Sequence, residues 1–322
     1  ITAGANQLFN YYSNALVDET AVPTAGAGGR HLGRLHSMMK MTSPLIDTAV
    51  YHPNLSLQQV LNADTSRLAM ANFGDLLADI RRFVDYDLLD DRLILDGALD
   101  GKSILIIAGA MVMDARTTAR INQWVRQGGV VFVLASRPVD WDGSTATMDS
   151  LVGFTSATDE VDGITEHVVP KPQALPSIAS LTNVILTKGY TNLSGDCELL
   201  LAMRYDPRIG VAWRRKVGAG AVYAYYGPMD LKQQESTWVV SNRLPLRFMQ
   251  DSFQACIAEK LLPQAPPTLN LDVPDLYKVL TTSGLWVLNM GAEPRDISYQ
   301  GATIHVPALD IVHQPAAGPV NR

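Results

Sequence analysis

The feature that constrains the fold most is an alternation of apolar runs with a helical segment in the first half of the chain. Residues 103–108 and 130–135 are nearly continuous apolar runs, typical of strands buried on both faces of a parallel sheet. Between them, Asp114 suits the N-cap of a helix, and Gly128-Gly129 suits its end. This order predicts an α/β fold with an open, mostly parallel sheet of the flavodoxin or Rossmann type.

Segments on both sides extend this alternation. Apolar residues at steps of three and four predict an amphipathic helix over 66–83. We expect further strands at 46–51, 86–89, 184–187, 198–203, 210–213 and 221–226, a hairpin turn at 216–220, and a long helix within 236–262.

The two ends of the chain are organised differently. Residues 1–45 are too short for a domain and read as the end of one. A proline-rich linker at 263–267 precedes short apolar segments separated by Gly and Pro turns, which predict a small antiparallel β domain. The tail from Gln314 is expected to fray. The predicted divisions are 1–45, 46–265 and 266–322.

Composition excludes several classes of protein. The chain has 322 residues, of which 47% are hydrophobic and 18% charged, and its net charge is −6. A nucleic-acid or anionic-membrane binder would carry a basic patch, and none is visible. The apolar content also excludes disorder, and no apolar stretch reaches the roughly 18 residues of a membrane span. Arg outnumbers Lys, which favours a homo-oligomer because Arg suits interfaces.

The two cysteines, Cys197 and Cys256, are too few for a disulfide framework, and we expect free thiols. Together with the absence of a visible signal segment they favour a cytoplasmic location. The chain begins at Ile1, which indicates a processed N-terminus or a piece of something longer.

Motifs for cofactor or nucleophilic chemistry are missing. Gly109 is the only glycine at the place where a dinucleotide fingerprint needs three, so no cofactor is predicted. Amidotransferases share this sheet type and place a Cys on a strand-to-helix turn. The corresponding turns, at 108–111 and 135–138, hold no Cys, and Ser136 is interpreted as an ordinary loop serine.

Metal and carboxylate sites are not predicted either. None of the six histidines has zinc-ligand spacing; they are His31, His36, His52, His167, His305 and His313. The cluster Asp85, Asp87, Asp90 and Asp91 lacks the glycine and closing Glu of a calcium loop and is interpreted as a solvated edge. No pair can be nominated for glycoside hydrolysis among Glu19, Glu160, Glu166, Glu198, Glu235, Glu259 and Glu293.

The order of segments resembles the C-terminal half of family 42 glycoside hydrolases, the β-galactosidase type. Those enzymes have a TIM barrel, an amidotransferase-like α/β domain used for trimerisation, and a small β domain. The resemblance rests on 4–12 and 28–35 as the end of the barrel, 47–53, 99–110, 121–135 and 218–223 in the trimerisation domain, and 285–290 in the β domain.

The resemblance implies a non-catalytic portion that assembles into a trimer and helps to wall a pocket for a galactoside. No catalytic residue is carried over, because the barrel that holds both catalytic carboxylates of the family is missing. Asn10, Tyr11 and Tyr12 would line the sugar pocket from the last barrel strand, or Tyr11 and Tyr12 serve packing alone. Two alternatives remain open: a stand-alone carbohydrate-binding or scaffold module, and an amidotransferase-like enzyme with an unconventional nucleophile.

Overall fold

The computed structural model describes residues 44–56, 83–171, 174–179, 185–227, 244–262 and 276–316, with parts of 73–81. The chain divides into two compact units. One is Ile46–Leu271, and the other combines Ile1–Leu45 with Asp272–Arg322. The predicted barrel end lies almost entirely outside the described residues and stays a prediction.

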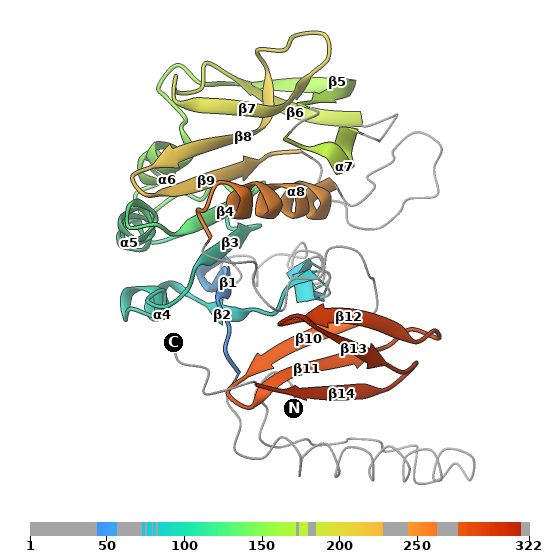
Figure 1. Ribbon diagram of the computed structural model, residues 1–322. Helices are drawn as coiled ribbons and strands as arrows, with labels where there is room; N and C mark the ends of the chain where they lie inside the picture. Colours follow the sequence, from blue (N-terminus) through green and yellow to red (C-terminus); the bar gives the residue numbers. More distant parts are fainter. Residues whose placement is uncertain are drawn as a thin grey trace, which may run out of the picture. The chain divides into compact units, whose positions relative to one another are not determined.

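The larger unit is built on one nine-stranded sheet with the order β2-β1-β3-β4-β9-β8-β6-β5-β7 (Figure 1). Its strands are β1 (Thr48–Tyr51), β2 (Asp87–Leu89), β3 (Ile104–Ala108), β4 (Val130–Leu134), β5 (Asp159–Pro170), β6 (Ile185–Thr191), β7 (Cys197–Met203), β8 (Gly210–Val217) and β9 (Gly220–Tyr225). Its helices are α4 (Asp91–Leu95), α5 (Ala115–Arg126), α6 (Ala146–Val152), α7 (Pro176–Ala179) and α8 (Leu244–Ala258).

Strands β2, β1, β3, β4 and β9 are parallel neighbours, which confirms the predicted α/β fold. The other four strands are antiparallel, and β7 pairs with both β5 and β8, so this end of the sheet curls onto itself. The curled end was not predicted. Strand β5 was missed because its polar residues and Gly163 hide the period-two pattern.

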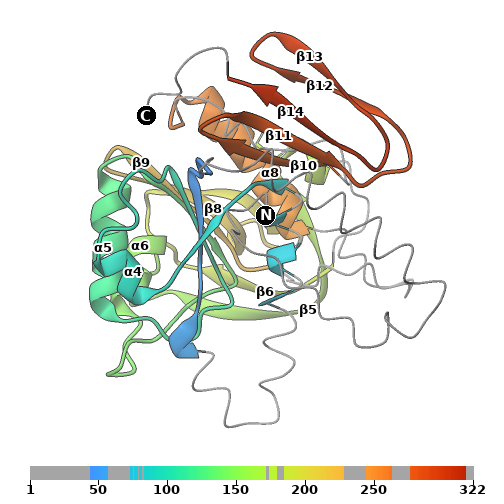
Figure 2. The same ribbon diagram turned by 90° about the horizontal axis from the view of Figure 1, so that it is seen from below.

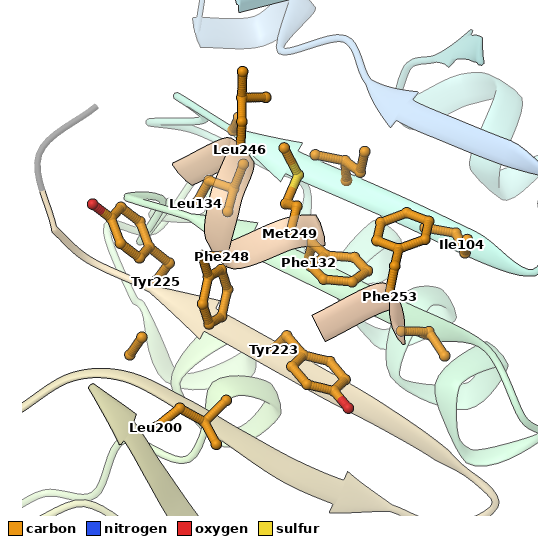
Figure 3. Packing of buried hydrophobic residues seen from close by; sticks show 14 of the residues in the cluster. Ile104, Phe132, Leu134, Leu200, Tyr223, Tyr225, Leu246, Phe248, Met249 and Phe253 are labelled. Carbon is orange, nitrogen blue, oxygen red and sulfur yellow. The ribbon is translucent and has the colours of Figure 1, made fainter. Parts of the chain in front are cut away.

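Helices cover the two faces of the sheet separately. Alternate residues of β3, β4 and β9 point to opposite faces, because side chains alternate along a strand. One face packs against α4, α5 and α6, and the other packs against α8 (Figure 2). On the α8 face, Phe253 stacks on Phe132 with ring centroids 4.8 Å apart, and Phe132 stacks on Tyr223 at 5.3 Å (Figure 3).

Local signals explain the element ends. The Asp114 side chain accepts a hydrogen bond from the Arg116 amide at 2.8 Å, which confirms it as the N-cap of α5. Gly128 follows the helix with φ of 121°, a conformation that disfavours side chains. The predicted hairpin joins β8 and β9, and a Cβ at Gly220 would meet the carbonyl oxygens of Gly129 and Val125.

In the smaller unit, the described residues form two antiparallel sheets. The first has the order β10 (Leu276–Thr281), β11 (Gly284–Asn289), β14 (Ile311–Pro315), and the second pairs β12 (Arg295–Tyr299) with β13 (Ala302–Val306). Gln314, where fraying was expected, pairs with Leu285 inside β14. The Leu45 amide donates to Leu280 O at 2.8 Å, so the segment before β1 extends the sheet beside β10.

None of the helices in the described residues is long and apolar enough to cross a membrane.

Candidate functional site

The carboxyl ends of the parallel strands form the edge of the sheet where a site is expected. In open α/β sheets ligands bind in the crevice beyond these strand ends. Five parallel strands end at this edge: β2, β1, β3, β4 and β9. The question is which of their polar groups are available to a ligand.

The turn after β3 directs its backbone amides at two buried serines. The Met111 and Val112 amides both donate to Ser56 Oγ at 2.9 Å. The Ala110 amide donates to Ser136 Oγ at 3.1 Å. In phosphate-binding folds, amides at this position cradle the anion. Here all three are committed to the protein's own side chains.

The turn after β4 contains an alanine, Ala135, in a strained backbone conformation. Ala135 is exposed and has φ of 46°, a left-handed conformation uncommon for a residue other than glycine. Its amide donates to Tyr225 O at 2.7 Å, and the Tyr226 hydroxyl donates to Ser136 O at 2.8 Å. In amidotransferase-like enzymes the strained turn presents a nucleophile. Ala135 cannot act as one.

Ser136 is buried in the same turn, and its hydroxyl donates to Leu134 O at 3.1 Å while accepting from Ala110. Both hydrogen bonds of the Ser136 hydroxyl are therefore to backbone atoms. Among the described residues, no histidine bonds to it. This is the arrangement of a structural serine, as interpreted from the sequence.

Two large apolar side chains stand out from these turns. Met111 is 59% exposed after β3, and Trp141 is 62% exposed after β4. The turns are joined side by side: the Val139 amide donates to Met111 O, and the Met113 amide donates to Val139 O, both at 3.0 Å. Met111 and Trp141 therefore project from two coupled turns at one edge of the sheet.

The four aspartates near β2 make ion pairs and hydrogen bonds within the protein. This corrects their interpretation from the sequence as a solvated edge. Asp85 is buried and forms an ion pair with Arg81. Asp90 caps α4 through the Leu93 amide at 2.9 Å. Asp87 forms an ion pair with Lys102.

Asp91, the fourth member, accepts the Tyr51 hydroxyl at 2.7 Å and the Asp114 amide at 3.2 Å. Burial, followed by the hydrogen bond to Asp91, raises the pKa of Tyr51, so its phenol stays protonated and donates. Within the described residues no group of three or more His, Cys, Asp and Glu side chains is placed to hold a metal ion.

Arg137 follows the strained turn and is fixed in place. Its guanidinium donates to both carboxylate oxygens of Asp149, at 2.8 and 2.9 Å, and lies 4.7 Å from the centre of the Phe154 ring. The hydrogen bonds to Asp149 raise the pKa of Arg137. Tyr226 packs on the same aromatic ring, so this cation anchors the turn.

Both cysteines are free thiols, as predicted. Burial raises the pKa of Cys197 to about 11 and that of Cys256 to about 12. Cys197 opens β7 and Cys256 lies in α8, where it is buried. Since the thiolate is the reactive form, neither is activated as a nucleophile.

Three of the described glutamates form ion pairs. Glu160 pairs with Lys188, Glu198 pairs with Lys171 and Arg214, and Glu259 pairs with Arg214. The predicted site residues Asn10, Tyr11 and Tyr12 lie outside the described residues. Sequence reasoning missed Met111 and Trp141, which no motif marks because their exposure depends on the turns.

Scans against protein-family models and against curated proteins give no match. Solved structures of β-galactosidases do share the fold. The chain aligns with the β-galactosidase from Bacillus circulans sp. alkalophilus at 14% identity and a TM-score of 0.57, covering 90% of this chain and 44% of that one. For the enzyme from Rahnella sp. the values are 14%, 0.60, 89% and 44%.

A catalytic mutant of a GH42 β-galactosidase from G. stearothermophilus aligns at 11% identity and a TM-score of 0.60, over 96% of this chain and 46% of that one. The chain therefore spans less than half the length of each of these three enzymes. This confirms the resemblance to family 42 at the level of the fold. Such coverage is consistent with a partial, C-terminal portion of such an enzyme.

Proposed function

We propose that this chain, which shares the fold of part of the family 42 β-galactosidases, is the assembly portion of a glycoside hydrolase of that kind. The observation that carries the proposal is the coverage: 89–96% of this chain matches 44–46% of each of the three enzymes. In this proposal the hydrolysis of β-galactosides belongs to a catalytic barrel, and the α/β unit holds copies together.

The chemistry of the sheet edge supports a non-catalytic role. The strained turn carries Ala135, its neighbour Ser136 bonds to backbone, and burial raises the pKa of both thiols. The strand order β2-β1-β3-β4-β9 within the parallel half supports the flavodoxin or amidotransferase-like description, because that order is typical of such sheets. These features favour a scaffold over an amidotransferase.

The open edge of the sheet offers a surface for assembly. Strand β2 is the terminal strand, and Leu88 on it is exposed. Leu93 and Leu95 on the adjoining α4 are exposed as well. Apolar side chains gathered at a sheet edge favour association with another chain. We place a contact of the proposed homotrimer here.

In the assembled enzyme Asn10, Tyr11 and Tyr12 would help to wall the pocket of a galactoside. Because barrel sites form at the carboxyl ends of strands, replacing Tyr12 with Ala in the assembled enzyme would raise KM with little change in the native mass. An unchanged KM would assign Tyr12 to packing.

The test of assembly is the native mass of the purified chain at micromolar concentration. We expect a trimer of 35.0 kDa subunits without β-galactosidase activity. The double variant Leu88→Glu, Leu93→Glu should shift the mass to that of a monomer, whereas Val169→Glu, at an exposed site on β5, should leave it unchanged. A monomeric parent chain, or hydrolysis by this chain alone, would overturn the proposal.

A further inference from the structure

The exposed pair Met111 and Trp141 is not used by the proposed assembly surface. The other tryptophans in the described residues, Trp124, Trp213 and Trp286, are buried. Single exposed apolar residues are common on protein surfaces. Trp141 differs because its turn is hydrogen-bonded to a neighbouring turn that carries a second exposed apolar side chain, Met111.

The turn that carries Trp141 is held rigid by its own hydrogen bonds. Asp140 Oδ1 accepts the amides of Asp142 and Ser144, both at 2.9 Å. The Asp140 amide donates to Ser144 O at 2.9 Å, and the Gly143 amide donates to Asp140 O at 3.0 Å. A ligand at Trp141 would therefore meet an ordered backbone turn and would not have to order it.

The buried serines extend this rigidity to the neighbouring turn. Ser56 fixes the amides of Met111 and Val112, and the backbone pairing at Val139 couples the two turns. The hydrogen bonds to Ser56 thus hold the turn of Met111 and occupy amides that could otherwise bind an anion, while those to Asp140 hold the turn of Trp141.

The size of the surface selects the kind of ligand. A stable contact between proteins buries about 800 Å² on each partner, far more than one indole ring and one thioether can cover. One sugar ring is comparable in size to an indole, and its apolar face can lie on an aromatic plane. The exposed side chains of Asp142 and Ser144 flank Trp141 and can hydrogen-bond to hydroxyl groups.

We propose that Met111 and Trp141 form a binding surface for a pyranose ring of a soluble oligosaccharide. The choice of a sugar rests on the proposed function, because the matched structures are β-galactosidases. A surface of this size would bind with a dissociation constant in the roughly millimolar range.

The test is a titration of the full chain with a β-1,4-linked galacto-oligosaccharide, followed by calorimetry and by tryptophan fluorescence. We expect saturable binding that Trp141→Ala weakens by at least about 10-fold and Met111→Ala weakens less. The control is Tyr205→Ala, at another exposed aromatic residue in the same unit, which should bind like the parent chain. Equal binding by Trp141→Ala, or no saturable binding by the parent chain, would overturn the inference.

The native mass separates this inference from the proposed assembly. Sugar binding by a monomeric chain would keep the Trp141 surface and remove the assembly role. Loss of the oligomer in Trp141→Ala, in a chain that binds no sugar, would make Trp141 a subunit contact and overturn the sugar site.

Discussion

Ser136 Oγ accepts the amide of Ala110 across 3.1 Å and thereby ties the turn after β4 to the turn after β3. Both residues are buried, so the bond has no competition from water. The hydroxyl that the sequence places at a possible nucleophile position thus holds two strand ends together.

Replacing this hydroxyl should cost stability. Ser136→Ala leaves the buried Ala110 amide without its partner, and an unsatisfied buried donor costs about 1–3 kcal/mol. Urea unfolding at neutral pH would measure the loss. Ser156→Ala, which removes an exposed hydroxyl, is the matched control and should change stability by less than about 0.5 kcal/mol. If Ser136→Ala also abolished a glutaminase activity, the structural role would be wrong.

The strain at the turn after β4 predicts a stabilising substitution. Ala135 has φ of 46°, and a side chain in this region costs about 1–2 kcal/mol relative to glycine. Ala135→Gly should raise the free energy of unfolding by about 0.5–1 kcal/mol, after allowing for the greater entropy of glycine in the unfolded chain. Ala110→Gly, at a residue without positive φ, should lower it.

The raised thiol pKa values predict slow chemistry at both cysteines. At a pKa of about 11, Cys197 holds on the order of 100-fold less thiolate at pH 8 than a thiol at the ordinary value of 9.0. Cys256 is buried in α8 and should react only when the chain unfolds. Iodoacetamide labelling followed by mass spectrometry, with and without denaturant, measures both. Rapid labelling of the native chain would contradict the burial.

The ion pairs at β7 and β8 predict a pH dependence of stability. The hydrogen bond from Lys171, followed by that from Arg214, lowers the pKa of Glu198 below its ordinary value of 4.5. A carboxylate with a depressed folded pKa stabilises the fold above its unfolded pKa, and this contribution is lost as pH falls through the folded value.

Glu198→Gln should therefore remove part of the stability at pH 7 and flatten its decline below about pH 4.5. Because Glu198 is more than a third exposed, the effect at pH 7 should be about 0.5 kcal/mol. Thermal unfolding between neutral and acidic pH checks this. Identical pH profiles for Glu198→Gln and the parent chain would contradict this role of Glu198.

Core packing predicts the largest loss. Phe253 is fully buried between Phe83 and Phe132, at ring-centroid distances of 5.1 and 4.8 Å. Phe253→Ala should cost about 3–5 kcal/mol because it removes apolar contact and leaves a cavity. Denaturant unfolding measures it, with Tyr205→Ala at an exposed turn as the control. A loss below about 1 kcal/mol would mean that α8 is not anchored as the structure has it.

The sequence by itself determined the parallel half of the fold. Residues 104–108 and 130–134 are apolar at every position because both faces of these strands are covered by helices. Asp114 and Gly128 marked the ends of α5 because capping is a local interaction. The family resemblance, confirmed for the fold, followed from the order of such segments.

Only the tertiary structure decided which side chains at the sheet edge are available. Ser56 and Ser136 lie 80 positions apart, yet both bond to the single turn after β3. Strand β5 pairs with β6 and β7, and the polar sequence of β5 does not show which strands are its partners. The exposure of Trp141 depends on a turn that Asp140 closes and on its coupling to Met111. Pairing and exposure are set by contacts between distant residues, whereas caps and apolar runs are set by neighbours in the chain.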